Sequence, residues 1–271
     1  MKSIMKKYKL VLFLSLLIYS CNVVSQDDND WSQSTITNLE DKITKTEGTI
    51  RYFVDPKMSI IERNNLIEMA AEYMKQNLML IEESYLRDSV YIVLVRDKDE
   101  MIKYAGGRIS GISMLKDYYV PENMICCIPK VLKHELMHIL VLLKWDPLIK
   151  KDVKHPDWLT EGLAVYADPK AEDLADLTLE EKYVYFYQNN KLLKLDLLTK
   201  FPSISDDPTQ IKIAYIQSGY IVQSLVERYG IQKLKELWIG NSDFEGIYGI
   251  CLEDMIQKID EEVDQKFNRE D

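Results

Sequence analysis

The spacing of apolar residues divides the chain into a first half with strand patterns and a second half with helical ones. In the first half, short apolar runs are bounded by glycine, proline or polar residues, which is typical of strands. Such runs predict strands at 48–56, 89–97, 106–115 and 123–129, and the one at 89–97 is apolar enough to be central in a sheet. Helices are predicted between these strands at 59–81, where Ser59 and Glu62 form a capping-box pattern, and at 98–105.

The helical pattern takes over at Pro129, because proline is well tolerated in the first turn of a helix. Helices are predicted at 129–145, 157–168, 177–188, 210–230, 231–240 and 244–267. The expected fold class is therefore α+β in two lobes. A mixed sheet with helices forms the lobe at 47–144, helices form the lobe at 145–271, and the helix after Pro129 lies at their junction.

Residues 1–20 have the pattern of a secretory signal, with a basic start and a short apolar run that is too short for a stable membrane span. The segment "LLIYSC" (16–21) resembles a bacterial lipobox, which implies cleavage before Cys21 and a lipid on that cysteine. Simple secretion, with Cys21 incidental, is the alternative. The expected location is the bacterial cell envelope, lipid-anchored at the outer membrane and facing the periplasm or the cell surface.

Residues 21–46 are polar and acidic, and predict a flexible tether ahead of one domain at 47–271. Within it, "QDDND" resembles the surface-export signal of lipoproteins from the Bacteroidetes, although a solvated linker has the same composition. Because residues 1–20 contain four lysines and no acid, their removal changes the net charge from −10 to −14. So acidic a domain is not expected to bind nucleic acid. The expected partners are a peptide or protein substrate and, through the lipid on Cys21, the membrane.

The stretch "VLKHELMHIL" (131–140) carries the candidate chemistry. His134 and His138 are one helical turn apart, so both imidazoles can reach one metal ion. Glu135 lies about 100° around the helix, where it can reach a metal-bound water as general base. The motif uses two of the chain's three histidines, and the helix around it is apolar. Buried histidines are costly unless they are paired or bind metal.

A catalytic zinc usually has three protein ligands, and Glu161 is the best candidate for the third. It follows His138 by 23 residues, which leaves room for the first helix to end and a second to return alongside. It also stands alone as an acid within an apolar helical stretch, "WLTEGLAVYA" (158–167).

HELMH followed by WLTEGLAVYAD resembles the gluzincins, the thermolysin- and aminopeptidase-like zinc peptidases, and is most similar to their peptidase MA-like members. The resemblance covers about residues 48–260 and implies a thermolysin-like two-lobe fold, one Zn²⁺ ion and Glu161 as the third ligand. It implies that Asp168 holds a ligand histidine by its second ring nitrogen. It also implies that Tyr215, or as second choice Tyr220, donates to the oxyanion. The alternatives are a helix-end position for Asp168 and packing for the tyrosines.

Two departures from the family separate the chain from aminopeptidases. The stretch "GGRISGISM" (106–114) occupies the place of their exopeptidase signature without its acid, and the step to Glu161 is slightly longer than theirs. His155 matches no family position and is expected to be a loop residue. The predicted function is therefore zinc-dependent endopeptidase cleavage, with a strand at 111–115 or 124–128 pairing with an extended substrate. The alternatives are a surface lipoprotein that only binds a protein or peptide, and a purely structural envelope protein.

Three cysteines remain after Cys21: Cys126, Cys127 and Cys251. Outside the cytoplasm, one of the adjacent pair can bridge to Cys251. The alternative is that they are buried thiols that pack as small apolar residues.

Overall fold

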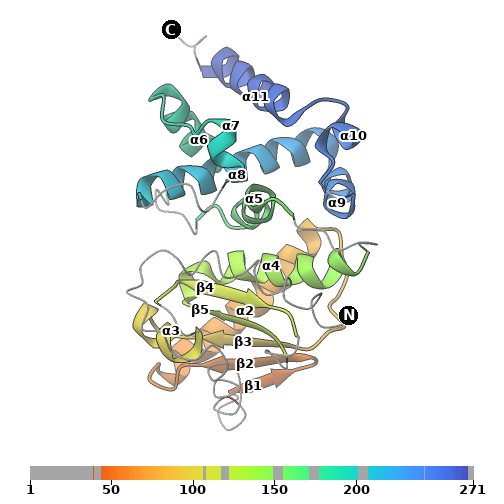
Figure 1. The fold of residues 1–271 in the computed structure, drawn as a ribbon. Coiled ribbons are helices and arrows are strands. Elements are labelled where there is room, and N and C mark those ends of the chain that lie inside the picture. The colour runs from red at the N-terminus through yellow and green to blue at the C-terminus, as the bar shows by residue number, and fades with distance from the viewer. Residues whose placement is uncertain are drawn as a thin grey trace, which may run out of the picture. The chain divides into compact units, whose positions relative to one another are not determined.

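The chain has the expected α+β fold, with a sheet in its N-terminal half and helices in its C-terminal half (Figure 1). The computed structural model describes residues 39, 44–105, 108–116, 122–148, 155–170, 177–200, 207–240 and 242–267. The chain divides into two compact units, an N-terminal unit that ends at Leu143 and a C-terminal unit that begins at Lys144. The signal segment, Cys21 and most of the expected tether lie outside the described residues. Within them, no helix is both long and apolar enough to cross a membrane.

Five strands of the N-terminal unit form one mixed sheet in the order β1-β2-β3-β5-β4. The centre is β3 (Val90–Leu94), which pairs in parallel with β2 (Ile50–Val54) and β5 (Asn123–Cys127). All five residues of β3 are buried, as its β-branched, apolar sequence predicts. At the edges, β1 (Lys45–Glu47) and β4 (Gly111–Met114) pair antiparallel with β2 and β5.

The strand β1 was not expected, because it begins within the range predicted as tether. Leu39, in the same range, is fully buried and packs with one face of the sheet. Strand structure therefore begins at Lys45, within the range whose composition indicated a tether.

The strand register sorts the residues of the sheet onto two faces. One face packs with α3 (Lys98–Ala105) in a core that includes Phe53, Tyr91, Val93, Met101, Tyr104, Ile112, Met114, Met124 and Cys126. On the opposite face, Tyr52, Ile92, Ile125 and Ser113 are aligned across four strands. Ser113 contacts the next helix along the chain after β5, so that helix covers this second face.

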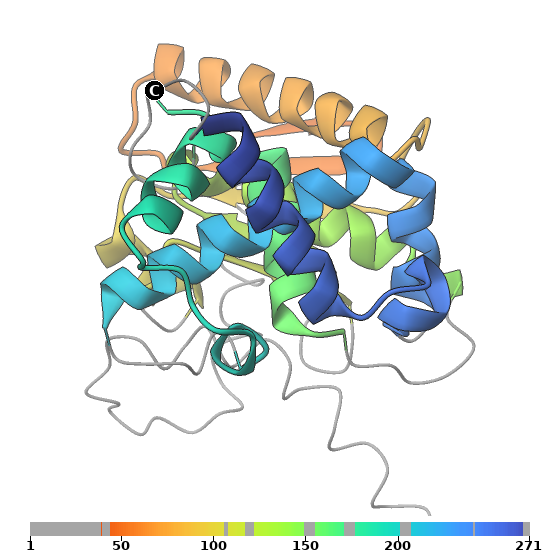
Figure 2. The same ribbon diagram turned by 90° about the horizontal axis from the view of Figure 1, so that it is seen from above.

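The long helix α2 (Ile60–Leu80) lies against β2 (Figure 2). Its predicted capping box is confirmed: Ser59 Oγ accepts from the N–H of Glu62 at 3.2 Å, and the Glu62 carboxylate accepts from the N–H of Ser59 at 2.8 Å. On its buried side, Asn77 Nδ2 donates to the carbonyl of Lys133 at 2.8 Å. This bond ties α2 to the start of the helix that carries the histidines.

That helix is α4 (Leu132–Lys144), which runs along the sheet beside β4 and β5 (Figure 1). The predicted proline start is confirmed, because the turn η2 (Pro129–Val131) leads directly into it. Nine residues of α4 are buried, including all of 134–141. A helix buried on nearly all sides must provide partners for its polar side chains.

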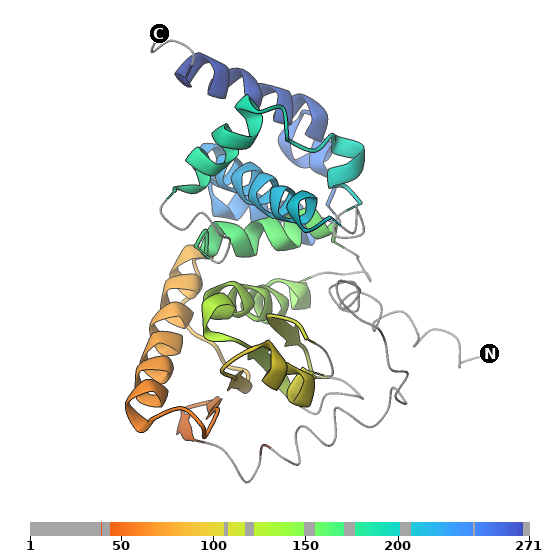
Figure 3. The same ribbon diagram turned by 90° about the vertical axis from the view of Figure 1, so that its left-hand side faces the viewer.

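The helix α8 (Pro208–Tyr229) is central in the C-terminal unit. Figures 1 and 3 show α5 (Asp157–Ala167) along one side of it, and α6 (Leu179–Gln188) and α11 (Leu252–Phe267) along the other. The unit also contains η3 (Asp146–Leu148), α7 (Leu195–Leu198), α9 (Ile231–Ile239) and α10 (Phe244–Tyr248). The closing stretch is two helices instead of one, because Gly249 adopts a left-handed conformation (φ 69°) that ends α10.

Two glycines allow α5 and α8 to pack closely. A Cβ on Gly162 would lie 2.6 Å from the carbonyl oxygen of Ser218, and a Cβ on Gly219 would lie 2.5 Å from Cγ1 of Val165. Such close approach holds α5 on α8, and Glu161 directly precedes the first of these glycines.

The cysteines of the described residues, Cys126, Cys127 and Cys251, are free thiols. Cys126 and Cys127 are fully buried. Burial, with the charge of Glu135 as the smaller cause, raises the pKa of both thiols, so they stay protonated. The structure therefore has the buried thiols of the second alternative, and no bridge to Cys251.

Candidate metal centre

His134 and His138 on α4 lie with their rings close together. Their Nε2 atoms are 3.1 Å apart and their ring planes meet at 79°. The two residues are only 7% and 5% exposed. The predicted shared face is confirmed, and two ring nitrogens this close can bind one ion.

Glu161 comes from α5 and is 7% exposed. Leu159, Gly162 and Leu163, close to it on this helix, are buried as well. A carboxylate in such surroundings is costly unless a hydrogen bond, an opposite charge or a metal ion compensates it.

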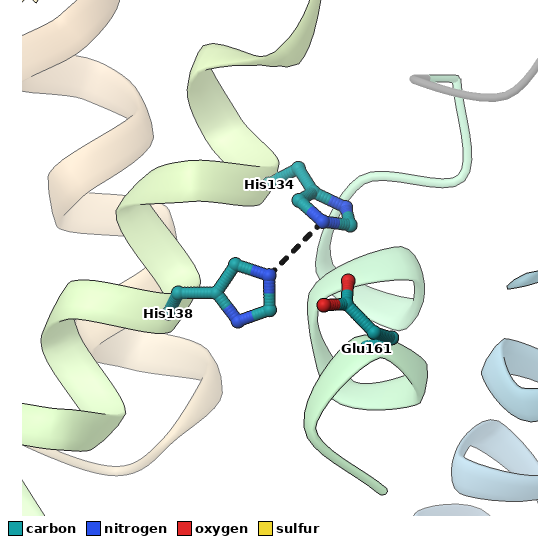
Figure 4. Close-up of side chains that lie close together, drawn as sticks. All are labelled: His134, His138 and Glu161. Atoms are coloured by element: carbon teal, nitrogen blue, oxygen red, sulfur yellow. Dashed lines mark hydrogen bonds between the residues drawn. The ribbon is translucent and has the colours of Figure 1, made fainter. Parts of the chain in front are cut away.

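His134, His138 and Glu161 form one group of possible metal ligands (Figure 4). One ligand atom of each lies within 4.8 Å of the others. A tetrahedral zinc ion with bonds of about 2.1 Å separates its ligand atoms by roughly 3.4 Å, so small side-chain movements would complete the site. Two imidazoles and a carboxylate are a common ligand set of catalytic zinc, with a fourth position open. The group could therefore hold one metal ion, and its ligand types are those of zinc sites.

Glu135 is 6% exposed and lies against β4 of the sheet. Ser113 Oγ lies 2.8 Å from Oε2 of Glu135 and 2.9 Å from the backbone carbonyl oxygen of Glu135. A Cβ on Gly111 would lie 2.4 Å from the other carboxylate oxygen, Oε1. Sequence reasoning singled out neither Gly111 nor Ser113. Strand alternation places both on one face, but it does not tell which helical side chain covers them.

Asp168 is the C-cap residue of α5, 9% exposed, and its N–H donates to the carbonyl of Ala164 at 3.0 Å. The fully buried Lys182 of α6 donates from Nζ to the next carbonyl, that of Pro169, at 2.6 Å. The helix-end position is thus observed. The predicted bond to a ligand histidine stays a prediction.

Tyr215 is half-buried on α8, and its predicted role as an oxyanion donor is likewise still a prediction. The second choice, Tyr220, donates from Oη to Glu180 at 3.3 Å and packs on the ring of Tyr183, with centroids 4.4 Å apart. Burial, followed by the charge of Glu180, raises the pKa of Tyr220. Its contacts therefore belong to the packing of α6 on α8.

His155 is a loop residue just before α5, as expected. Its ring stacks on Trp238 with centroids 4.0 Å apart, and its Nε2 lies 3.7 Å from Asp146 Oδ1. Trp238 Nε1 donates to the same carboxylate oxygen at 2.8 Å. The third histidine thus belongs to an aromatic cluster of the C-terminal unit.

No family model matches the chain, and no curated protein sequence matches it. The likeness to gluzincins therefore depends on the motif residues themselves. The structural support for it is the buried group of His134, His138 and Glu161.

Proposed function

We propose that the protein is a zinc metallopeptidase that cleaves peptide bonds within peptides or proteins. The observation that carries the proposal is the buried group of His134, His138 and Glu161. These residues would hold the ion, and Glu135 follows the first of them in the chain. A structural zinc site usually has four protein ligands, whereas three leave the fourth position to water.

A zinc ion held by His134, His138 and Glu161 would supply Lewis acidity and would lower the pKa of its water to about 7. The Glu135 carboxylate accepts a proton from the attacking water and passes it to the nitrogen of the leaving amine. We assign Tyr215 as a donor to the developing oxyanion and Asp168 as the residue that orients a ligand histidine. These last two assignments come from the family resemblance alone.

The position of β4 at the edge of the sheet supports the proposal that this strand pairs with an extended substrate. Within the described residues, β4 has a neighbouring strand on one side only, while β5 is paired on both sides. An unpaired strand edge offers N–H and C=O groups to a peptide backbone. Of the two strands considered, residues 111–114 therefore fit this role and 123–127 do not.

We also propose that the protein is attached to the bacterial outer membrane by a lipid on Cys21. The support is the basic and apolar pattern of residues 1–20 and the "LLIYSC" segment. Detergent partition of the wild-type chain beside Cys21→Ser tests this attachment.

Zinc analysis and a cleavage screen on unstructured proteins test the function together. We expect wild-type protein to contain zinc and to cut, and Glu135→Gln to keep the zinc while losing activity by at least ~100-fold. Glu253→Gln, at an exposed position on α11, controls for loss of one carboxylate.

The two measurements also separate the alternatives. Full activity in Glu135→Gln contradicts the proposed base. Zinc-loaded wild-type protein that cuts nothing would be a binding protein with a peptidase-like site. Protein purified without stoichiometric zinc, and unable to bind it, would match a structural envelope protein.

A further inference from the structure

The strand β4 lies against the Glu135 side chain and contacts it through two of its residues. Gly111 and Ser113 are two positions apart on this strand, so they share a face, while Ile112 points to the core on the other side. Both contact the Glu135 side chain. We call these two residues the Gly111–Ser113 seat.

Gly111 provides room for the carboxylate. A Cβ at this position would lie 2.4 Å from Oε1, 2.6 Å from Cγ and 2.7 Å from Cδ of Glu135. Contacts this short do not occur, so any side chain here would displace the Glu135 side chain. The Glu135 carboxylate thus lies directly over the strand backbone.

Ser113 provides the hydrogen bond. Its side chain is 1% exposed, and its Oγ lies 2.8 Å from Oε2 and 2.9 Å from the carbonyl oxygen of Glu135. A hydroxyl has one hydrogen for these two acceptors. It can therefore hold the carboxylate, and can also release it while keeping a bond to the helix backbone.

Because Ser113 and Glu135 are both buried, their hydrogen bond is expected to fix the position of the Glu135 carboxylate. Glu135 is 6% exposed, and a buried carboxylate without a hydrogen-bond donor is costly. Hydrogen bonds to a charged acceptor are also stronger and shorter than neutral ones. A donor that is itself held on a strand fixes the carboxylate better than water does.

We propose that Ser113 is a positioning residue that holds Glu135 in place for proton transfer, with Gly111 providing the space. This inference rests on the proposed peptidase function. A displacement of about 1 Å at a reacting group can cost about 100-fold in rate. Loss of the Ser113 hydroxyl is therefore expected to lower kcat. Zinc binding depends on His134, His138 and Glu161, and substrate pairing on the β4 backbone, so the substitution should leave zinc content and KM unchanged.

The test compares Ser113→Ala with Ser113→Thr and with Ser224→Ala, a buried serine of α8 that serves as the matched control. For Ser113→Ala we expect kcat to fall roughly 10- to 100-fold with KM and zinc content unchanged. Ser113→Thr keeps the hydroxyl and should recover most of kcat. A loss from packing alone would not be recovered by this larger side chain. Unfolding midpoints of all variants show whether each one folds.

Crystal structures of zinc-loaded wild-type protein and Ser113→Ala give a readout that does not need activity. We expect the Glu135 carboxylate to leave its place over Gly111 in the variant. Wild-type kcat in Ser113→Ala, or a carboxylate in an unchanged position, overturns the inference. If wild-type protein binds zinc but cuts nothing, the peptidase proposal fails, and the carboxylate position alone decides the role of Ser113.

Discussion

The site residues that could be predicted from the sequence are polar residues isolated within apolar helices. His134 and His138 were predictable because helical spacing alone places them on one face. Glu161 was predictable because an acid in the middle of an apolar helix requires a partner. Ser113 could not be predicted as a site residue, because a serine on a strand suggests no special role unless the side chain that it contacts is known. Its role depends on a contact between residues 22 positions apart.

Asp260, which lies on α11 and outside the metal centre, is expected to make the stability of the protein depend on pH. Tyr183 Oη donates to its Oδ1 at 2.7 Å, and burial raises the pKa of Asp260 above its ordinary value. A carboxyl group whose pKa is raised by folding binds its proton more tightly in the folded state. Its contribution to stability is therefore present at low pH and is lost as the pH rises through the folded-state pKa.

The variant Asp260→Asn removes this titration and keeps an oxygen that can accept from Tyr183. We expect its stability relative to wild type to be greater at pH 7 than at pH 4, in urea unfolding at both pH values. Asp254→Asn, at an exposed position on the same helix, is the control for one lost charge. A stability difference that does not change with pH contradicts this prediction.

Helices with a local start signal were predicted well at the scale of elements. The capping box of α2 and the proline before α4 both mark the observed starts. The helix α7 was missed because its four residues are too few to show a helical period. The closing helix was predicted as one because its apolar period continues past Gly249, whose left-handed backbone interrupts it.

The close packing of α5 on α8 predicts how two glycine substitutions change the free energy of unfolding. Alanine at Gly162 would meet the backbone of Ser218, which cannot turn away, whereas alanine at Gly219 would meet side-chain atoms of Val165 and Leu179. Overpacking costs about 1–3 kcal/mol, against a gain of up to about 1 kcal/mol in helix propensity. We expect Gly162→Ala to lower the free energy of unfolding more than Gly219→Ala does. Equal losses in urea unfolding, or a larger one for Gly219→Ala, would contradict this account of the packing.

The fold class at the scale of the molecule followed from the grouping of strand patterns before helical ones. The strand order did not follow, because alternation assigns a residue to a face but does not name the neighbouring strand. The insertion of β5 between β3 and β4 therefore appears only in the structure. That insertion makes β4 an edge strand, which supports its proposed role toward substrate.

The proposed function requires that His134, His138 and Glu161 bind one zinc ion. The most direct measurement is a crystal structure of the purified protein with anomalous data collected at the zinc edge. We predict about one zinc ion per chain, held by two imidazole nitrogens at about 2.0–2.1 Å and by the Glu161 carboxylate at about 2.0–2.2 Å. A zinc-soaked crystal without anomalous signal at these residues, or with zinc bound without Glu161, would contradict it.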